Sequence, residues 1–432
     1  MKRTVTAAGR IATWLAVVTI GLGPSGIVQA QTADPGVVAQ DRHGLSAERL
    51  DRLRTELQRY VDEGRLAGAV VQIRQDGRTV FSHAVGWRDR EAGDPMREDS
   101  IFRIASQTKA LTSVAILMLM EEGRLLLSDP VGKHLPEWQN TTVAVAKPDG
   151  GYDVVPAQRP ITIRDLLTHT AGISYGSGPA EQAWQDAGFA GWYFADRDEP
   201  VAAAVARMGS LPMAAQPGTE FVYGYNTDIL GVVVEKLSGM SLQAFLDARL
   251  ITPLGMKDTA FFLPPAKADR LAVVYEAADG GLTRAADADA WTGGGHHGQG
   301  HYVDGPRIAA SGGAGLLSTA TDYSRFLEML RSGGELDGRR YLSRKSVELM
   351  VSNHLGAIEY DPGMGFGLGF AVRLDPGTAG EPGSKGEFSW GGAYHSQYWV
   401  DPAEGLTVVY LTQLLPAGDI DDHGKLRALI YQ

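Results

Sequence analysis

The chain of 432 residues contains no cysteine. This absence excludes a disulfide framework, a thiolate-bound zinc, an iron–sulfur cluster and a cysteine nucleophile. Covalent catalysis by this chain must therefore use an oxygen or a nitrogen nucleophile.

Runs of lysine and arginine are also absent, and the formal net charge is 40 − 51 = −11. Because a protein that follows a phosphate backbone needs clustered cations, we expect no nucleic-acid partner. Glycine and proline number only 54 and 21, and 44% of the residues are hydrophobic. These proportions predict a globular protein with its own core rather than a disordered chain.

The first thirty residues differ from the rest. Three basic residues lie within the first ten, a mostly apolar segment without charge follows, and Val28-Gln29-Ala30 offers small residues for cleavage. Glycines and a proline between 21 and 26 interrupt the apolar run before it reaches the roughly 20 residues that a membrane anchor needs. We expect a signal peptide over residues 1–30 and a mature chain 31–432 that is periplasmic or secreted, with no membrane span.

Both ends of the mature chain predict strands, whereas its middle predicts helices. A helix capped by Ser46 precedes a β-hairpin over 69–87 that turns at Asp76-Gly77. Three more strands are predicted near the C-terminus, at 367–373, 396–400 and 406–412, before a last helix from about 421. Further helices are predicted at 106–122, 162–169, 201–208, 227–237, 241–250, 322–330 and 344–352.

An antiparallel sheet can combine hairpins from both ends of a chain while helices cover its faces. We therefore expect an α/β fold, with an antiparallel sheet flanked by helices and a mostly helical insertion. The α/β part would comprise about 45–110 and 305–432, and the helical part about 111–304, with a cleft between them. Asp149-Gly150-Gly151 predicts a surface hairpin within the insertion.

The first candidate catalytic pair is Ser106 and Lys109, in the sequence Ser106-Gln107-Thr108-Lys109. On a helix, residues three apart share a face, so the amine of Lys109 can reach the hydroxyl of Ser106. The free N–H groups of a first helical turn also favour negative charge beside Ser106. A serine N-cap followed by a solvated lysine is the alternative, so this pair alone does not establish catalysis.

The second candidate is a tyrosine in Phe221-Val222-Tyr223-Gly224-Tyr225-Asn226, just before a predicted helix. A tyrosine beside a lysine can take the serine proton and return it to the leaving group. The alternative is an aromatic core residue whose hydroxyl has one partner. The two tyrosines, Tyr223 and Tyr225, leave the choice between them open.

The third candidate is Trp390-Gly391-Gly392-Ala393, which precedes a predicted strand. Paired glycines allow a backbone to approach a ligand closely. An N–H at this position, opposite the N–H of Ser106, would form a two-donor oxyanion hole. Taken alone, the same residues are equally typical of the end of a strand.

In this order, the three elements resemble the serine β-lactamase and penicillin-binding-protein superfamily, and within it the esterases similar to class C β-lactamases (family VIII carboxylesterases). The S-x-x-K element is common to the superfamily. The resemblance extends from about Leu45 to the C-terminus. Further similar segments are LLTHTAG at 166–172, PGT at 217–219, SGGAGLLST at 311–319 and GFGLG at 365–369.

The resemblance implies a serine hydrolase that forms an acyl-enzyme on carboxylic esters or lactones and needs no cofactor or metal. Ser106 would be the nucleophile, Lys109 its activating partner and Tyr223 the general base. The N–H groups of Ser106 and Ala393 would form the oxyanion hole. The residues expected to contact the substrate are Trp390, Gly391, Gly392, His395 and Tyr225.

Two departures from the β-lactamase pattern bear on the substrate. Tyr223-Gly224-Tyr225 stands where β-lactamases usually have Tyr-x-Asn, so Asn226 comes one position late. Trp390-Gly391-Gly392 stands where they have Lys-Thr-Gly, which removes the cation that attracts a β-lactam carboxylate. Both changes favour neutral esters or lactones. A β-lactamase or D-Ala peptidase acting on cell-wall-like substrates is one alternative, and a non-catalytic penicillin-binding or sensor module is another.

Several histidines remain. We expect His169 to be a hydrogen-bonded structural residue beside the site, and His395, two residues past Ala393, to touch substrate or solvent. His296, His297 and His301 lie in a glycine-rich segment, but their spacing fits no helix-borne zinc pattern. We therefore expect a loop near the mouth of the cleft there rather than a metal site.

Three further aromatic residues, Trp184, Trp192 and Tyr193, are either walls of an acyl pocket or ordinary core residues.

Overall fold

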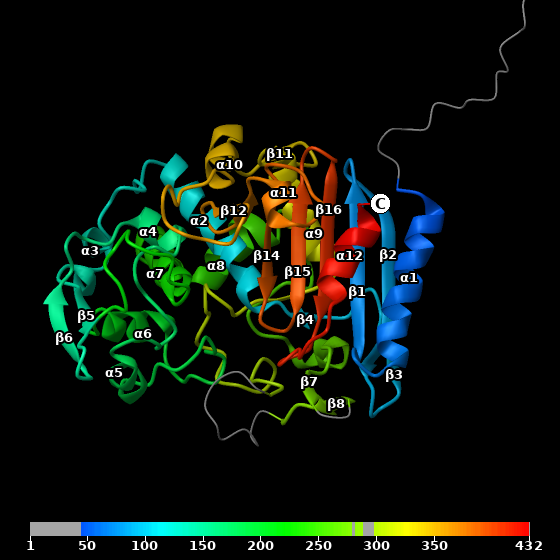
Figure 1. Cartoon of the computed structure of the whole chain (residues 1–432), viewed down its shortest axis with the longest axis horizontal. Helices are drawn as coiled ribbons and strands as arrows, with labels where there is room; N and C mark the ends of the chain where they lie inside the picture. The colour runs from blue at the N-terminus through cyan, green and yellow to red at the C-terminus, as the bar shows by residue number, and fades with distance from the viewer. Residues whose placement is uncertain (1–44, 279–280, 288–297, 432) are drawn as a thin grey trace, which may run out of the picture. The chain divides into compact units, whose positions relative to one another are not determined.

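An eight-stranded sheet organises the computed structural model, which describes residues 45–278, 281–287 and 298–431 (Figure 1). All neighbouring strands in it are antiparallel. Their order is β12 (Met364–Phe366), β13 (Ala371–Arg373), β14 (Phe388–Gly392), β15 (Ser396–Asp401), β16 (Leu406–Thr412), β1 (Gly68–Gln75), β2 (Arg78–Asp89) and β3 (Asp94–Pro95). The two ends of the described chain meet in the pairing of β1 with β16, where Ala69 lies opposite Thr412. The predicted antiparallel α/β fold is confirmed.

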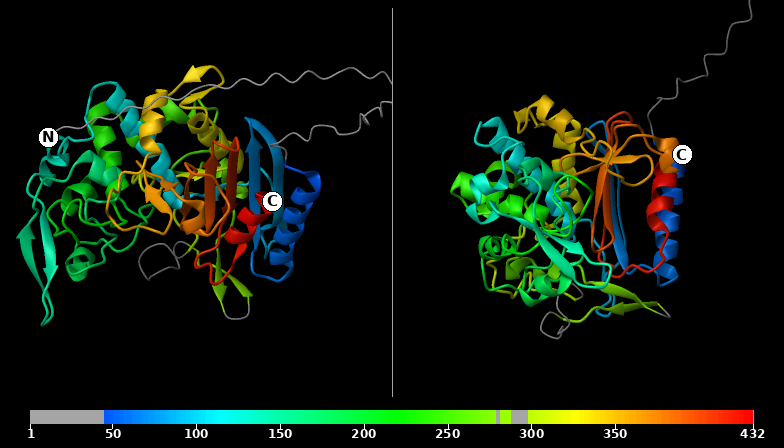
Figure 2. Two further views of the ribbon diagram at one scale, coloured as in Figure 1. Left: turned by 45° about the horizontal axis from the view of Figure 1, so that its top comes forward. Right: turned by 60° about the vertical axis from the view of Figure 1, so that its left-hand side comes forward.

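Two terminal helices cover one face of this sheet, α1 (Ala47–Asp62) and α12 (Asp422–Ile430) (Figure 2). The side chain of Ser46 caps α1 by accepting a hydrogen bond from the Arg49 N–H, as predicted. Leu53 and Leu57 of α1 and Leu426 of α12 are buried in one apolar cluster with the strands. Burying each such leucine stabilises the fold by about 1.5–3 kcal/mol.

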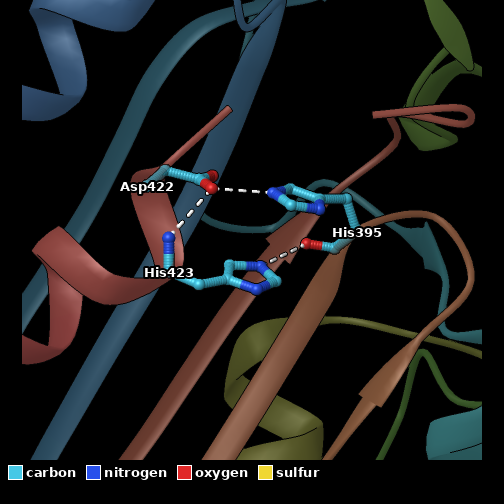
Figure 3. A group of neighbouring side chains, drawn as sticks. All are labelled: His395, Asp422 and His423. Atoms are coloured by element: carbon cyan, nitrogen blue, oxygen red, sulfur yellow. Dashed lines mark hydrogen bonds and ion pairs between the residues drawn. The ribbon is translucent and has the colours of Figure 1, made fainter. Parts of the chain in front are cut away.

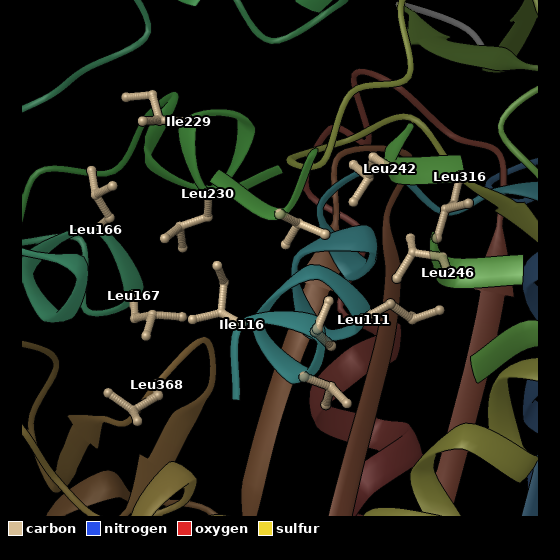
Figure 4. Packing of buried hydrophobic residues seen from close by; sticks show 14 of the residues in the cluster. Leu111, Ile116, Leu166, Leu167, Ile229, Leu230, Leu242, Leu246, Leu316 and Leu368 are labelled. Atoms are coloured by element: carbon tan, nitrogen blue, oxygen red, sulfur yellow. The ribbon is translucent and has the colours of Figure 1, made fainter. Parts of the chain in front are cut away.

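The opposite face packs against α2 (Thr108–Glu121), which lies in the largest apolar cluster of the described chain. Residues 108–119 of α2 are all buried, so this helix is surrounded by protein on every side. Figure 4 shows its neighbours from α4 (Ile163–Leu167), α7 (Asn226–Ser238) and α8 (Leu242–Leu246). Side chains at the start of α2 are therefore held by a rigid core.

The remaining helices and strands complete the described chain. They are α3 (Val131–His134), α5 (Glu181–Asp186), α6 (Val201–Met208), α9 (Ala320–Arg331), α10 (Arg344–Met350), α11 (Pro376–Ala379), and the strand pairs β4 (Phe102–Arg103) with β9 (Leu317–Ser318), β5 (Thr142–Ala146) with β6 (Tyr152–Pro156), β7 (Tyr275–Ala278) with β8 (Gly281–Arg284), and β10 (Glu335–Leu336) with β11 (Arg339–Arg340). In the described ranges, no single helix is long and apolar enough to cross a membrane. One bent pair in the described residues, Asn226–Ser238 with Leu242–Ile251, meets those criteria when its two helices are combined.

Two predicted elements differ in the structure. The predicted strand 367–373 is confirmed only at 371–373, which form β13; residues 367–370 are the turn that joins β12 to β13, and Gly369 there has a φ of +98°. A β-carbon at Gly369 would lie 2.4 Å from the Ser113 hydroxyl, so the tight turn against α2 needs a glycine. The predicted helix 241–250 changes after α8 into a π-turn, Asp247–Ile251. The hairpin predicted at 149–151 is confirmed as β5 and β6.

The described residues belong to a single unit, Leu45–Gln432. The division into an α/β part and a helical part stays a prediction, and the predicted signal peptide lies outside the described residues.

Candidate active site

Ser106 lies on a 3-10 turn, Ala105–Gln107, that leads directly into α2. The preceding residue, Ala105, is fully buried and has a φ of +42°, a backbone conformation that residues other than glycine rarely adopt. Strand pair β4 and β9 fixes the entry to this turn, and the Ile104 N–H donates to the Leu316 carbonyl at 3.1 Å. The fold thus maintains a strained turn that leaves Ser106 half-buried while its neighbours are enclosed.

Lys109 is buried, with 1% of its surface exposed. Its Nζ lies 3.2 Å from the Ser106 Oγ, 2.9 Å from the Tyr175 hydroxyl and 2.8 Å from the Gly313 carbonyl oxygen. An ammonium group has three N–H donors, and these three acceptors satisfy all of them. The contacts offset the cost of burying the amine and hold it next to the serine oxygen.

Asp228, on α7, helps to hold the Gly313 backbone that Lys109 contacts. Its buried Oδ1 accepts hydrogen bonds from the Ser311 hydroxyl at 2.6 Å and from the Gly313 N–H at 3.0 Å. It therefore helps to fix Gly313, the residue whose carbonyl accepts from Lys109. Burial raises the pKa of Asp228, whereas the charge of Lys109 opposes that rise. A β-carbon at Gly313 would lie 2.4 Å from the Asp228 Oδ2, so glycine is required at this close approach.

The ring of Tyr223 lies against the Lys109 amine. The Lys109 Nζ lies 4.7 Å from the centre of the Tyr223 ring. The Tyr223 hydroxyl accepts a hydrogen bond from the Trp390 indole N–H at 3.1 Å. The tyrosine hydroxyl that contacts Lys109 directly is that of Tyr175, which sequence reasoning missed. Burial, then the neighbouring Tyr223 and Asp228, raise the pKa of Tyr175 well above its usual value, so this hydroxyl stays protonated.

The end of β14 lies against the turn that carries Ser106. A β-carbon at Gly392 would come within 2.5 Å of the Ile104 carbonyl oxygen, which shows how closely the two backbones approach. Ala393 follows and packs beside Ala105. Within the described ranges, neither the Ser106 N–H nor the Ala393 N–H donates a hydrogen bond to a protein acceptor. Both donors are therefore available to a ligand.

Two residues predicted to contact substrate lie elsewhere. Tyr225 is fully buried, donates its hydroxyl to the Gly191 carbonyl and stacks on Trp184 at 5.9 Å. The His395 side chain turns toward α12 and lies 2.7 Å from Asp422 (Figure 3). The expected substrate contacts of Tyr225 and His395 are therefore corrected, whereas Trp390, Gly391 and Gly392 stay candidates.

His169 is the structural residue that its sequence context predicts. It is 1% exposed, and its Nδ1 lies 2.9 Å from the Asn226 amide nitrogen, which also donates to the Ile173 carbonyl. Burial first, and the charge of Lys109 second, place the pKa of His169 well below its usual value. The ring packs on Tyr223 at 4.6 Å and so positions it.

The remaining sequence candidates lie at a distance from these contacts or beside Ala393. Of the three clustered histidines, His296 and His297 fall outside the described residues, and His301 lies 3.1 Å from the Tyr193 hydroxyl. Trp184 and Tyr193 are buried core residues. Trp192 is partly buried and packs in the same apolar cluster as Ala393, so a wall of the acyl pocket at this position stays a prediction.

A serine followed three residues later by a lysine, here brought together at the start of a helix, is a feature of serine β-lactamases and penicillin-binding proteins. The Beta-lactamase family model matches residues 53–432. The chain belongs to this family, in its esterase branch. Esterase EstB of Burkholderia gladioli is 34% identical over 397 residues, which cover 89% of this chain and 94% of EstB.

Two solved structures are similar to this chain, and each match covers 89% of this chain and 98% of the chain in that structure. EstCE1, described as a hydrolase with promiscuous acyltransferase activity, is 29% identical with a TM-score of 0.75. Simvastatin synthase (LovD) of Aspergillus terreus is 25% identical with a TM-score of 0.74.

Proposed function

We propose that this protein is a serine hydrolase that cleaves carboxylic esters and lactones through an acyl-enzyme on Ser106. The observation that carries the proposal is the buried Lys109 amine 3.2 Å from the accessible Ser106 hydroxyl. The names of its relatives, Esterase EstB and lovastatin esterase, support an ester as the substrate class.

In the proposed acylation, Tyr223 acts as a phenolate whose charge the Lys109 ammonium stabilises. The Ser106 oxygen attacks the ester carbonyl carbon while its proton passes to the phenolate oxygen, so Tyr223 becomes neutral and the negative charge moves to the carbonyl oxygen. The N–H groups of Ser106 and Ala393 hold the tetrahedral oxyanion. Its collapse breaks the bond to the alkoxy oxygen, which takes the proton and leaves as an alcohol. Water then attacks the acyl-enzyme by the reverse sequence and releases the carboxylic acid.

The groups around Tyr223 support an apolar, uncharged substrate. Trp390 stands where a β-lactamase has a lysine, and it packs edge-on against Phe366 at 5.2 Å. Phe221 stacks on the Tyr223 ring with the centres 6.4 Å apart, and its centre lies 4.8 Å from that of the Tyr360 ring. These aromatic side chains offer apolar contact area rather than a cation for a carboxylate.

A substrate panel on the wild type and Ser106→Ala in parallel tests this proposal. We expect the wild type to hydrolyse p-nitrophenyl acetate, p-nitrophenyl butyrate and an aliphatic lactone much faster than nitrocefin. Ser106→Ala should lose all of these activities. If Ser106→Ala keeps wild-type turnover, Ser106 is not the nucleophile, and comparable turnover of nitrocefin would favour the β-lactamase alternative. No hydrolysis and no phosphonate labelling of Ser106 would favour the non-catalytic module.

We also propose that residues 1–30 direct export and are removed. Sequencing the N-terminus of the protein from a periplasmic or culture fraction should find a start at about residue 31. A protein that keeps Met1 and stays in the cytoplasm would contradict this.

A further inference from the structure

The turn Ala393-Tyr394-His395 joins β14 to β15 and carries one of the two N–H groups proposed to bind the oxyanion. Its backbone is fixed at two carbonyls. The Tyr394 carbonyl accepts from the Thr412 hydroxyl at 2.8 Å and from the Leu414 N–H at 3.1 Å. The His395 carbonyl lies 3.0 Å from the His423 Nε2. The second contact comes from α12, on the face of the sheet opposite α2.

His395 itself has a φ of +64°, which is unfavourable for a side chain with a β-carbon. Its Nε2 lies 2.7 Å from the Asp422 Oδ1, and its ring stacks on His423 with the centres 4.0 Å apart and the planes 10° from parallel (Figure 3). Asp422 is 1% exposed and also accepts a hydrogen bond from the Tyr410 hydroxyl. The unusual conformation of the turn is thus maintained by contacts with α12.

The helix that supplies these contacts is anchored independently of them. Arg427 of α12 forms a buried ion pair with Glu387 at 2.7 Å and donates to the Pro382 carbonyl at 3.0 Å. Burial raises the pKa of Asp422, but the hydrogen bond and the charge of His395 outweigh this and hold it below the usual value. Asp422 is therefore an anion, and its hydrogen bond with His395 is charge-assisted and strong.

His395, Asp422 and His423 are residue types that also bind metals, and their ligand atoms lie within 4.8 Å of one another. A metal, however, is bound along the lone pair of each imidazole nitrogen, in the plane of the ring. Two stacked and nearly parallel rings direct those lone pairs side by side, so they do not converge on one ion. The observed geometry is that of a hydrogen-bonded clamp.

We infer that His395 and Asp422 are positioning residues that hold the 393–395 turn so that the Ala393 N–H faces the oxyanion. The inference rests on the proposed function. In the described chain, α12 contacts none of the proposed catalytic side chains. The inference nevertheless assigns this helix a role in the chemistry on the other face of the sheet.

Two pairs of variants test the inference. His395→Asn keeps a residue that tolerates the left-handed conformation, but its shorter side chain stops short of Asp422. Its matched control is Asp421→Asn, the adjacent residue, whose carboxylate contacts Tyr60 and Lys425 on the α1 side instead. Asp422→Ala removes the acceptor, whereas Asp422→Asn keeps an oxygen for His395.

We expect His395→Asn and Asp422→Ala to lower kcat/KM for p-nitrophenyl butyrate by at least about tenfold, the scale for misplacing a group that acts only in the transition state. Affinity for a trifluoromethyl ketone, which mimics the tetrahedral state, should fall by the same factor, while affinity for the butyrate product should change less than about twofold. Asp421→Asn and Asp422→Asn should stay within about threefold of the wild type.

Circular dichroism and thermal melting establish that each variant is folded at the assay temperature. If His395→Asn fails to fold, the comparison of Asp422→Ala with Asp422→Asn decides. Folded His395→Asn with wild-type kcat/KM and wild-type ketone affinity would overturn the inference, as would a wild type whose Tm falls on treatment with EDTA, because a metal would then hold the cluster. A wild type without esterase activity or labelling at Ser106 would instead refute the proposed function.

Discussion

Gly392→Ala probes the contact between the end of β14 and the turn of Ser106. The added β-carbon would lie 2.5 Å from the Ile104 carbonyl oxygen, a backbone atom with no rotamer to change. This is about 1 Å inside van der Waals contact, so the two backbones must separate by a distance of that order. We expect unfolding free energy to fall by about 1–3 kcal/mol, as for other overpacked sites.

The same displacement moves the Ala393 N–H away from the Ser106 N–H. A misplacement of about 1 Å can cost about a hundredfold in rate, which corresponds to about 2.7 kcal/mol in activation free energy. The assay is kcat for p-nitrophenyl butyrate at a temperature where urea melts show the variant to be folded.

Gly391→Ala is the matched control, because its β-carbon would meet only the Ser396 carbonyl oxygen, at 3.1 Å. We expect it to keep kcat within a few-fold of the wild type, whereas a substrate contact at Gly391 would change KM. If Gly392→Ala and Gly391→Ala have equal kcat and equal stability, the close approach of β14 to the Ser106 turn does not matter for catalysis, and the reasoning is refuted.

Three further predictions concern the residues around Lys109. Tyr223→Phe should lower kcat by at least about a hundredfold. Tyr175→Phe removes one of the three hydrogen-bond partners of the Lys109 amine and should lower kcat by about tenfold. A larger loss of kcat for Tyr175→Phe than for Tyr223→Phe would assign the general base to Tyr175 instead. Asp228→Ala leaves two buried donors unpaired and should destabilise the fold by about 2–5 kcal/mol in urea melts, more than Asp228→Asn, and equal stability of the two would contradict the role of its Oδ1. Burial lowers the pKa of His169, so below its usual pKa the imidazole is protonated in the unfolded chain but stays neutral in the folded chain. Below about pH 6.5 this residue should therefore reduce stability by up to about 1.4 kcal/mol per pH unit, and His169→Asn should show a shallower fall between pH 6.5 and 5.5 than the wild type.

The parts of the fold that the sequence predicts correctly are those set by local chemistry. Asp76-Gly77 specifies a tight hairpin turn, and Ser46 caps a helix with one apolar face. The predicted strand 367–373 runs through Gly369, where the structure has a turn. This left-handed turn is imposed by the close approach of α2, which no local pattern records.

The candidate site divides in the same way. Ser106 and Lys109 could be predicted because three residues along a helix bring their side chains together. Tyr175 and Gly313 reach the same amine from positions 66 and 204 residues along the chain, so only tertiary packing reveals them. Asp228 leaves no comparable signal in the sequence, because it follows Asn226 and Thr227 in the first turn of α7, where acidic residues are common.

His395 was assigned to the substrate because it follows Ala393 so closely. Its contact with Asp422 on α12 turns the side chain away from Ser106, and α12 comes from the far end of the chain.

Covalent labelling of the nucleophile tests the central claim most directly. After inactivation with a p-nitrophenyl alkylphosphonate, mass spectrometry of the digested protein should find one adduct per chain, on Ser106, with activity falling in proportion to labelling. Ser106→Ala should remain unlabelled. An adduct on another residue that accounts for the lost activity, or full inactivation without any adduct on Ser106, would contradict the account.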